Sequence, residues 1–135
     1  MKRKSIIIIL CFGAFGLFAF VPNTFTSQTP WPVPEAAKNK KNPVPSDAAS
    51  VASGKALYNT HCKSCHGTKG KGDGSKAAQL DTDCGDFTKS TFQSQTDGAI
   101  FYKTSEGRKD MPSFKKKIAD TDDIWALVNY MKTLK

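Results

Sequence analysis

Cysteine and histidine come together in this 135-residue chain at Cys62, Cys65 and His66, which form a Cys-x-x-Cys-His motif. This spacing is the attachment pattern of a c-type haem. Each thiol can add across one haem vinyl group, and a two-residue gap on a helical turn sets the sulfurs at about the vinyl separation. The next residue then carries its imidazole under the iron. We therefore predict one covalently bound haem c, with thioether bonds from Cys62 and Cys65 and with His66 as an axial ligand.

Three other kinds of site also use cysteines at this spacing. A thioredoxin-like redox pair would follow a strand in a βαβ unit, and no strand pattern precedes Cys62. A disulfide between Cys62 and Cys65 would close too small a loop to stabilise the chain much. A zinc site made of Cys62, Cys65, Cys84 and a histidine is the main competitor. Nothing else in the chain resembles the second paired half of a zinc ribbon, so haem is favoured.

The second axial position of a haem iron needs a soft or nitrogen ligand from elsewhere in the chain. His61 lies on the attachment helix and cannot easily reach the opposite haem face, so we interpret it as a solvated helix residue. Of the three methionines, Met1 is in the leader and Met131 belongs to an apolar helix face. Met111 is left, and Pro112 stiffens the chain beside it and favours extended geometry there. A thioether from Met111 would favour ferrous iron and raise the reduction potential.

The N-terminus has the pattern of an export signal. Positive residues 2–4 precede an unbroken apolar run at 6–21, which would reach about 24 Å as a helix, short of a ~30 Å hydrocarbon core. Length favours a cleaved signal peptide, whereas Pro22 opposes cleavage directly after the run. We therefore assign residues 1–26 to a signal peptide or an N-terminal membrane tether. In either case the remainder is exported across the inner membrane and is periplasmic.

A proline-rich linker, residues 27–46, follows the leader. Its five prolines favour extended polyproline geometry over regular helix. The linker is either an arm on which a domain swings or a strap, with Trp31 and Val33 packed back on the domain. The domain itself, residues 47–135, has 14 basic and 11 acidic residues, against a whole-chain net charge of +8. Such a mild charge on an exported domain excludes nucleic acid as the expected partner.

Helices must position the motif residues, because no alternating strand pattern is present. Residues 120–123 supply capping oxygens and negative charge for a C-terminal helix. Four apolar residues then follow at helical spacing: Ile124, Leu127, Val128 and Met131. Ser46 can cap an earlier helix through about Asn59, and 97–104 predicts a short helix that stops near Gly107. So few helices make a thin core, which a bound cofactor would complete.

With these elements in place, the chain resembles small class I c-type cytochromes with one haem. Matching residues follow the family's order around and after the motif: Gly54, Tyr58, Gly67, Met111, Pro112, Leu127 and Tyr130. The resemblance implies an all-α fold, a small cytochrome c-like helical domain wrapped around its covalently attached haem. It also implies that Gly54 and Tyr58 cross the terminal helix near Leu127 and Tyr130. In this family a backbone carbonyl after the motif fixes the second ring nitrogen of the haem histidine.

One-electron transfer is the function that this reading predicts. With His66 and Met111 on the iron, no open position remains, so we expect a carrier between redox partner proteins and not an enzyme. A tethered cytochrome subunit of an oxidase or dehydrogenase complex is the alternative within the same chemistry. An open-haem enzyme or sensor and a Cys/His zinc module are less favoured.

Two further features bear on the partners. Lysines flank the motif and follow the methionine: Lys63, Lys69, Lys71, Lys76, Lys115, Lys116 and Lys117. They are either a positive collar that steers a partner with an acidic docking face or a solvated surface. Cys84 has no partner once the haem takes its pair, and three nearby carboxylates should raise its thiol pKa. We expect a sluggish free thiol and a monomer, with a disulfide dimer as the other possibility.

Overall fold

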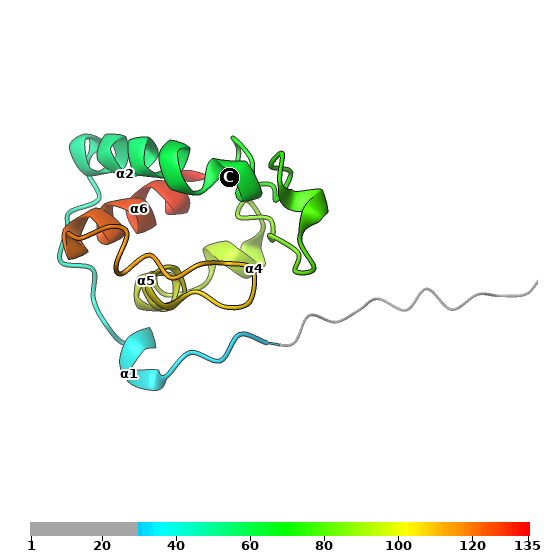
Figure 1. The fold of residues 1–135 in the computed structure, drawn as a ribbon. Helices are drawn as coiled ribbons and strands as arrows, with labels where there is room; N and C mark the ends of the chain where they lie inside the picture. The colour runs from blue at the N-terminus through cyan, green and yellow to red at the C-terminus, as the bar shows by residue number, and fades with distance from the viewer. Residues whose placement is uncertain (1–29) are drawn as a thin grey trace, which may run out of the picture. The chain divides into compact units, whose positions relative to one another are not determined.

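Helices make up the regular secondary structure of residues 30–135, the part of the chain that this computed structural model describes (Figure 1). Their bounds are α1 (Glu35–Lys38), α2 (Ala48–His61), α3 (Lys63–His66), the 3-10 helix η1 (Ala77–Gln79), α4 (Ser90–Gln93), α5 (Asp97–Glu106) and α6 (Thr121–Thr133). Within that range no strand forms, and a single antiparallel bridge joins Arg108 to Met111. The predictions for residues 1–26 and for the first linker residues lie outside the described part.

Local signals place the ends of the three longer helices. Asp47, and not the predicted Ser46, caps α2: its carboxylate accepts from the Ser50 amide, and the Ser50 hydroxyl accepts from the Asp47 amide. Asp120 caps α6 as predicted, since its carboxylate accepts from the amide of Asp122. Helix α5 extends two residues beyond the predicted end and stops at Gly107, which has a positive φ of 69°.

Helices α2 and α6 pack side by side, and their crossing forms the centre of the fold (Figure 1). A Cβ on Gly54 would overlap the backbone carbonyl oxygen of Ala126 and would lie 2.9 Å from the Cβ of Tyr130. Glycine at this position therefore lets the two helix backbones approach closely. The rings of Tyr58 and Tyr130 pack beside it at a tilt of 60°, with centroids 5.2 Å apart. This is the crossing that the resemblance implied.

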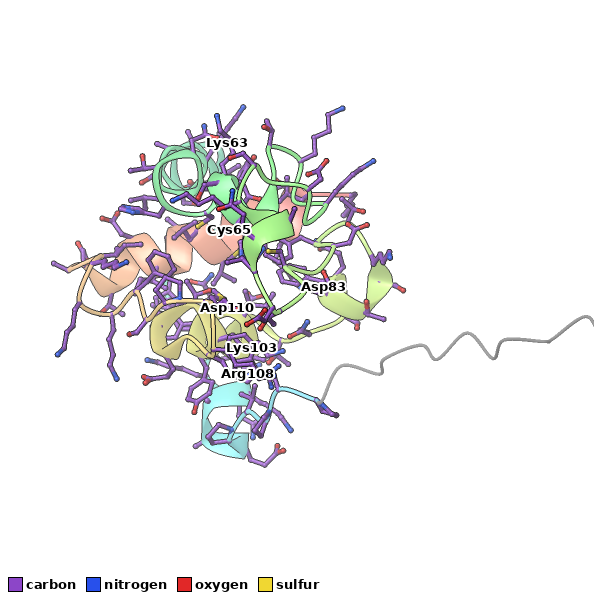
Figure 2. The ribbon with its side chains drawn as sticks, turned by 45° about the vertical axis from the view of Figure 1, so that its right-hand side comes forward. Lys63, Cys65, Asp83, Lys103, Arg108 and Asp110 are labelled. Atoms are coloured by element: carbon purple, nitrogen blue, oxygen red, sulfur yellow. The ribbon has the colours of Figure 1, made fainter. Side chains whose placement is uncertain are left out.

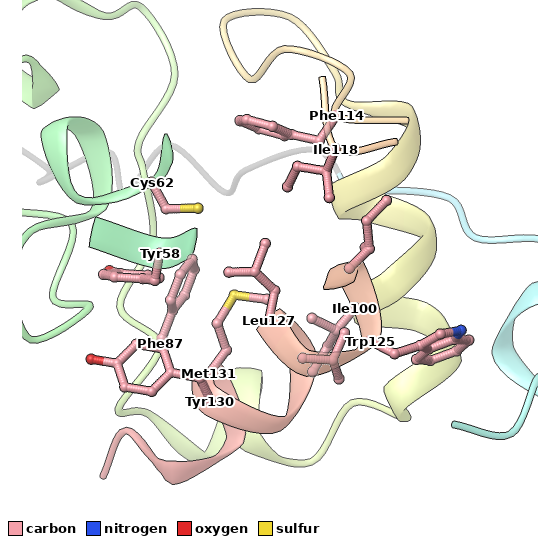
Figure 3. Close-up of a cluster of buried hydrophobic side chains, with 12 residues drawn as sticks. Tyr58, Cys62, Phe87, Ile100, Phe114, Ile118, Trp125, Leu127, Tyr130 and Met131 are labelled. Carbon is pink, nitrogen blue, oxygen red and sulfur yellow. The ribbon is translucent and has the colours of Figure 1, made fainter. Parts of the chain in front are cut away.

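The hydrophobic core lies along the buried face of α6 (Figure 3). The most deeply buried large side chains are Trp125, Tyr58, Leu127 and Val128. Trp125 stacks on Phe101 of α5 with ring centroids 4.0 Å apart, so α5 joins the same core. The apolar spacing predicted for the C-terminal helix thus corresponds to real burial.

Residues 31–46, which we call the strap, pack against α5 and α6 as in the second of the two linker alternatives. The Thr96 hydroxyl donates to the Lys38 carbonyl over 2.8 Å. The side chain of Asn42 donates to that of Asn129 over 2.8 Å, and Asn129 donates to the carbonyls of Val44 and Pro45. Contrary to the expectation of extended geometry throughout, the strap contains one helical turn, α1. Pro34 is the N-cap of that turn. Its missing N–H costs no hydrogen bond there, because the first amides of a helix have no partner within the helix.

None of the helices formed by residues 30–135 combines the length and the apolar character needed to cross a membrane.

Candidate haem-binding site

The Cys-x-x-Cys-His motif forms one tight helical turn at the end of α2. Cys62 closes α2 and opens α3, and its carbonyl accepts from the amides of both Cys65 and His66, at 3.1 and 3.0 Å. Cys62 is buried in the core cluster, with its sulfur turned toward the interior (Figure 3), and Cys65 is half-buried. The turn brings the two thiols and the imidazole onto one short helix, as covalent haem attachment requires.

A glycine-rich loop then folds back along this turn. Gly67 ends α3 with a φ of 80°, and its carbonyl accepts from the buried Tyr58 hydroxyl over 2.8 Å. The amide of Gly72 donates to the His66 carbonyl over 2.9 Å, and the amide of Gly74 donates to the Cys65 carbonyl over 3.2 Å. The loop therefore satisfies the free carbonyls of the motif and holds it against α2.

The His66 imidazole is suited to bind a metal. Burial lowers its pKa, while a hydrogen bond that the ring donates to the backbone of Cys84 acts in the opposite direction. The net shift favours the neutral ring, which is the form that ligates iron. Nδ1 is buried without a hydrogen-bond partner among the described protein atoms. Phe87 packs on the ring, with centroids 4.5 Å apart. A half-buried, neutral imidazole whose buried Nδ1 has no protein partner fits a group that the protein atoms do not themselves supply.

Met111 lies in a short loop, residues 107–114, which we call the methionine loop. Its backbone pairs with Arg108 through two hydrogen bonds of 2.9 and 3.0 Å. The Ser113 hydroxyl donates to the Ser105 carbonyl of α5 over 2.6 Å. The Asp110 carboxylate accepts from the Thr82 amide over 2.9 Å, and so joins the loop to the segment that follows the motif. Met111 itself is half-buried against the core cluster that contains Cys62.

One sequence interpretation changes at the edge of this site, and one open question is answered. His61 is half-buried, and its ring meets Phe114 of the methionine loop edge-on with centroids 6.0 Å apart, so it is not the solvated residue that we expected. The sequence could not indicate which backbone group reaches His66, and the structure brings the backbone of Cys84 to it. No sequence pattern marks this contact, because it depends on how the intervening loop folds.

Cys84 is a half-buried thiol that forms no disulfide with the other cysteines of residues 30–135. Burial raises its pKa, and the neighbouring Cys65, Asp83 and Asp110 add to the rise, so the predicted effect of carboxylates is part of the cause. Among residues 30–135, no three His, Cys, Asp or Glu side chains converge closely enough to hold a metal ion. The donor set of the zinc alternative is therefore not assembled.

The helical fold and the Cys-x-x-Cys-His turn define a c-type cytochrome. The family model described as cytochrome c oxidase, cbb3-type, subunit III matches residues 49–131, and the chain belongs to this family. No curated protein gives a significant match.

Three solved structures are similar to this chain. One belongs to the Kuenenia stuttgartiensis reducing HAO-like protein complex Kustc0457/Kustc0458, with 27% identity and a TM-score of 0.63 over 68% of this chain and 46% of that chain. The chain thus spans less than half of that protein. Another is the KustC0563 c-type cytochrome, with 30% identity and a TM-score of 0.53 over 61% of this chain and 96% of that chain. A variant of Kustc0563 is similar at 28% identity, with a TM-score of 0.52 over 62% and 99%.

The protein is thus an all-α, monohaem c-type cytochrome with covalently bound haem c, the cofactor of electron-transfer proteins. The three motif residues lie on one turn, and Met111 lies in a loop joined to the segment that follows the motif. Their individual roles as thioether anchors and axial ligands stay predictions.

Proposed function

We propose that the protein is an exported one-electron carrier, not an enzyme, in which His66 and Met111 are the axial ligands of a haem anchored by Cys62 and Cys65. The haem supplies the reversible one-electron change of its iron. Two protein ligands would leave no iron position open to a substrate. They would also keep the coordination the same in both oxidation states, so little reorganisation opposes transfer.

This proposal rests mainly on one observation: hydrogen bonds hold the methionine loop in place. Met111 is held by its backbone pairing with Arg108 and by the contacts of its neighbours with α5 and with Thr82. A loop fixed in this way can keep a weak thioether ligand in place without a change of backbone on reduction. Met131, by contrast, is only 4% exposed within the apolar face of α6, so core packing accounts for it.

A visible absorption spectrum of the exported protein, oxidised and then reduced, tests the ligand set. We expect sharp low-spin c-type bands that remain with the protein after acid-acetone extraction, and a weak far-red sulfur-to-iron band in the oxidised form. The far-red band should be lost in Met111→Leu and kept in Met131→Leu, a matched control at the other methionine of the domain. A high-spin spectrum in the unmodified protein would refute His/Met ligation and favour the open-haem alternative.

Charged side chains near the motif support a docking face for an acidic partner. The lysines of the predicted collar are exposed: Lys63, Lys69, Lys71, Lys76, Lys115, Lys116 and Lys117. Asp81, Asp83 and Asp110 are exposed as well, so the charge around the site is mixed. If the collar steers association, the bimolecular rate with an acidic partner falls as salt is raised, whereas a merely solvated face gives little dependence.

A permanently docked subunit is the second candidate, and one comparison favours it. The similar Kuenenia chain is part of a protein complex, and its additional length lies outside this similarity. Purification of the native protein under mild detergent separates the two candidates. A free carrier elutes alone, whereas a subunit copurifies with a stable partner.

Export of the protein to the periplasm, with or without a tether at residues 1–26, is part of the same proposal. Fractionation of cells and the mass of the mature chain test it. A soluble periplasmic product that lacks the apolar run indicates a cleaved signal, and a membrane-bound full-length product indicates a tether. The half-buried thiol of Cys84, with its raised pKa, supports a monomer.

A further inference from the structure

We propose that the strap positions the methionine loop through Trp31, and so strengthens the hold of Met111 on the iron. The inference rests on the proposed ligation by Met111. Trp31 lies outside residues 49–131, the part that matches the family. It would therefore be a feature of this chain that is added to the family's core.

Trp31 meets the methionine loop through Arg108. The Arg108 guanidinium carbon lies 4.7 Å from the centre of the indole ring, within the range of a cation–π contact. Arg108 in turn exchanges two backbone hydrogen bonds with Met111. Arg108 thus connects the strap to the proposed ligand, because its side chain contacts Trp31 and its backbone pairs with Met111.

The same indole ring faces a second cation. The ammonium of Lys103 lies 5.7 Å from the ring centre, and Figure 2 shows the Lys103 and Arg108 side chains next to each other beside the strap. Two positive groups on one ring repel each other, and the pKa of Lys103 is lowered by its burial and by Arg108. The electron-rich face of Trp31 attracts both groups and so offsets part of the repulsion between them.

The methionine loop needs support from outside, because its turn is strained. Lys109, directly between Arg108 and Asp110, has a φ of 52°, a conformation that non-glycine residues disfavour. Such a residue persists only where surrounding contacts over-determine the backbone. Trp31 provides one of these contacts.

Other contacts hold the strap on the domain, so Trp31 belongs to a segment whose position does not depend on the methionine loop. Lys38 accepts from the Thr96 hydroxyl, and the Lys40 ammonium lies 4.7 Å from the Phe101 ring centre. Asn42 is bonded to Asn129 of α6. These contacts do not involve the methionine loop. A change at Trp31 can therefore loosen the loop while the rest of the strap stays in place.

Binding of free imidazole to the oxidised holoprotein measures how strongly Met111 is held on the iron, because imidazole binds only when the methionine leaves the iron. A cation–π contact of ordinary strength corresponds to about a fivefold change in such an equilibrium. We expect Trp31→Ala to raise the imidazole affinity about fivefold and Trp31→Phe, which keeps an aromatic face, to stay close to the parent. Pro32→Ala, a change at the neighbouring exposed strap residue, is the matched control.

A double-variant cycle gives the specific test. If Trp31 acts through Arg108, the effects of Trp31→Ala and Arg108→Ala on imidazole affinity are less than additive. One outcome would overturn the inference: Trp31→Ala lowers the unfolding temperature, but its imidazole affinity equals that of Pro32→Ala. Trp31 would then be only structural. Retention of the far-red band in Met111→Leu overturns the proposed ligation, and the inference with it. The two failures are thus distinguishable.

Discussion

Substitution of Gly54 by alanine tests the helix crossing that positions the haem-binding turn. The added Cβ would overlap the Ala126 carbonyl oxygen and approach the Tyr130 Cβ to 2.9 Å, and both groups lie on a buried helix that cannot turn away. Forcing an extra methyl group into such a contact costs up to about 3 kcal/mol. Alanine recovers about 1 kcal/mol through its better helix propensity. The net loss is therefore about 2 kcal/mol, or roughly 8–16 °C in Tm for a domain of this size.

Thermal and urea unfolding of the holoprotein measure this loss. The control is Ser53→Ala, an exposed neighbour on the same helix, which should change stability by less than about 0.5 kcal/mol. We also expect less haem to be attached in Gly54→Ala, because Cys62 closes the helix that would be displaced. A Gly54→Ala protein as stable as the parent would refute the close approach of α2 and α6.

Three more substitutions test other contacts. Burial raises the pKa of the Tyr58 hydroxyl above its ordinary value of 10.0. Above that pH the unfolded chain loses the Tyr58 proton while the folded protein keeps it. The free energy of unfolding therefore falls as the pH rises, by up to about 1.4 kcal/mol per pH unit. Tyr58→Phe should flatten that fall in unfolding measured from pH 9 to pH 11.5, and an unchanged slope would contradict the buried hydroxyl. Lys109→Gly should stabilise the protein by about 1 kcal/mol, since glycine accepts a positive φ without strain; a loss of stability in urea unfolding would show that the turn is not strained. Asn129→Ala removes hydrogen bonds that hold the strap and should cost about 2 kcal/mol, with faster proteolysis between residues 31 and 46 as the second readout; an unchanged cleavage rate would argue against a docked strap.

Features encoded locally could be predicted from the sequence. The haem-attachment turn follows from the spacing of Cys62, Cys65 and His66 within one helical turn, and the C-terminal helix follows from its cap and its apolar face. The all-α fold was implied by the family resemblance, and the family match and the similar solved structures confirm it. The crossing at Gly54 came from the resemblance and not from any local pattern.

Features that depend on distant partners could not be predicted. Nothing near Asn42 shows that its side chain meets Asn129, 87 residues further along the chain, so the strap and the swinging arm were equally open. The contact of His61 with Phe114 and the approach of Cys84 to His66 likewise arise only after the loops have folded. The short helices α1 and α4 contain four residues each, too few for a periodic pattern.

The docked strap also changes how far a tethered form of this protein could search for its partners. With residues 31–46 held on the domain, the free chain between the apolar run and the domain shrinks from residues 22–46 to residues 22–30 at most. Nine residues reach at most about 32 Å even when fully extended. Effective concentration falls roughly as the −3/2 power of linker length, so shortening 25 residues to nine raises it about fivefold at a partner embedded in the same membrane. Strap docking would thus favour neighbours within the membrane plane over partners that diffuse freely.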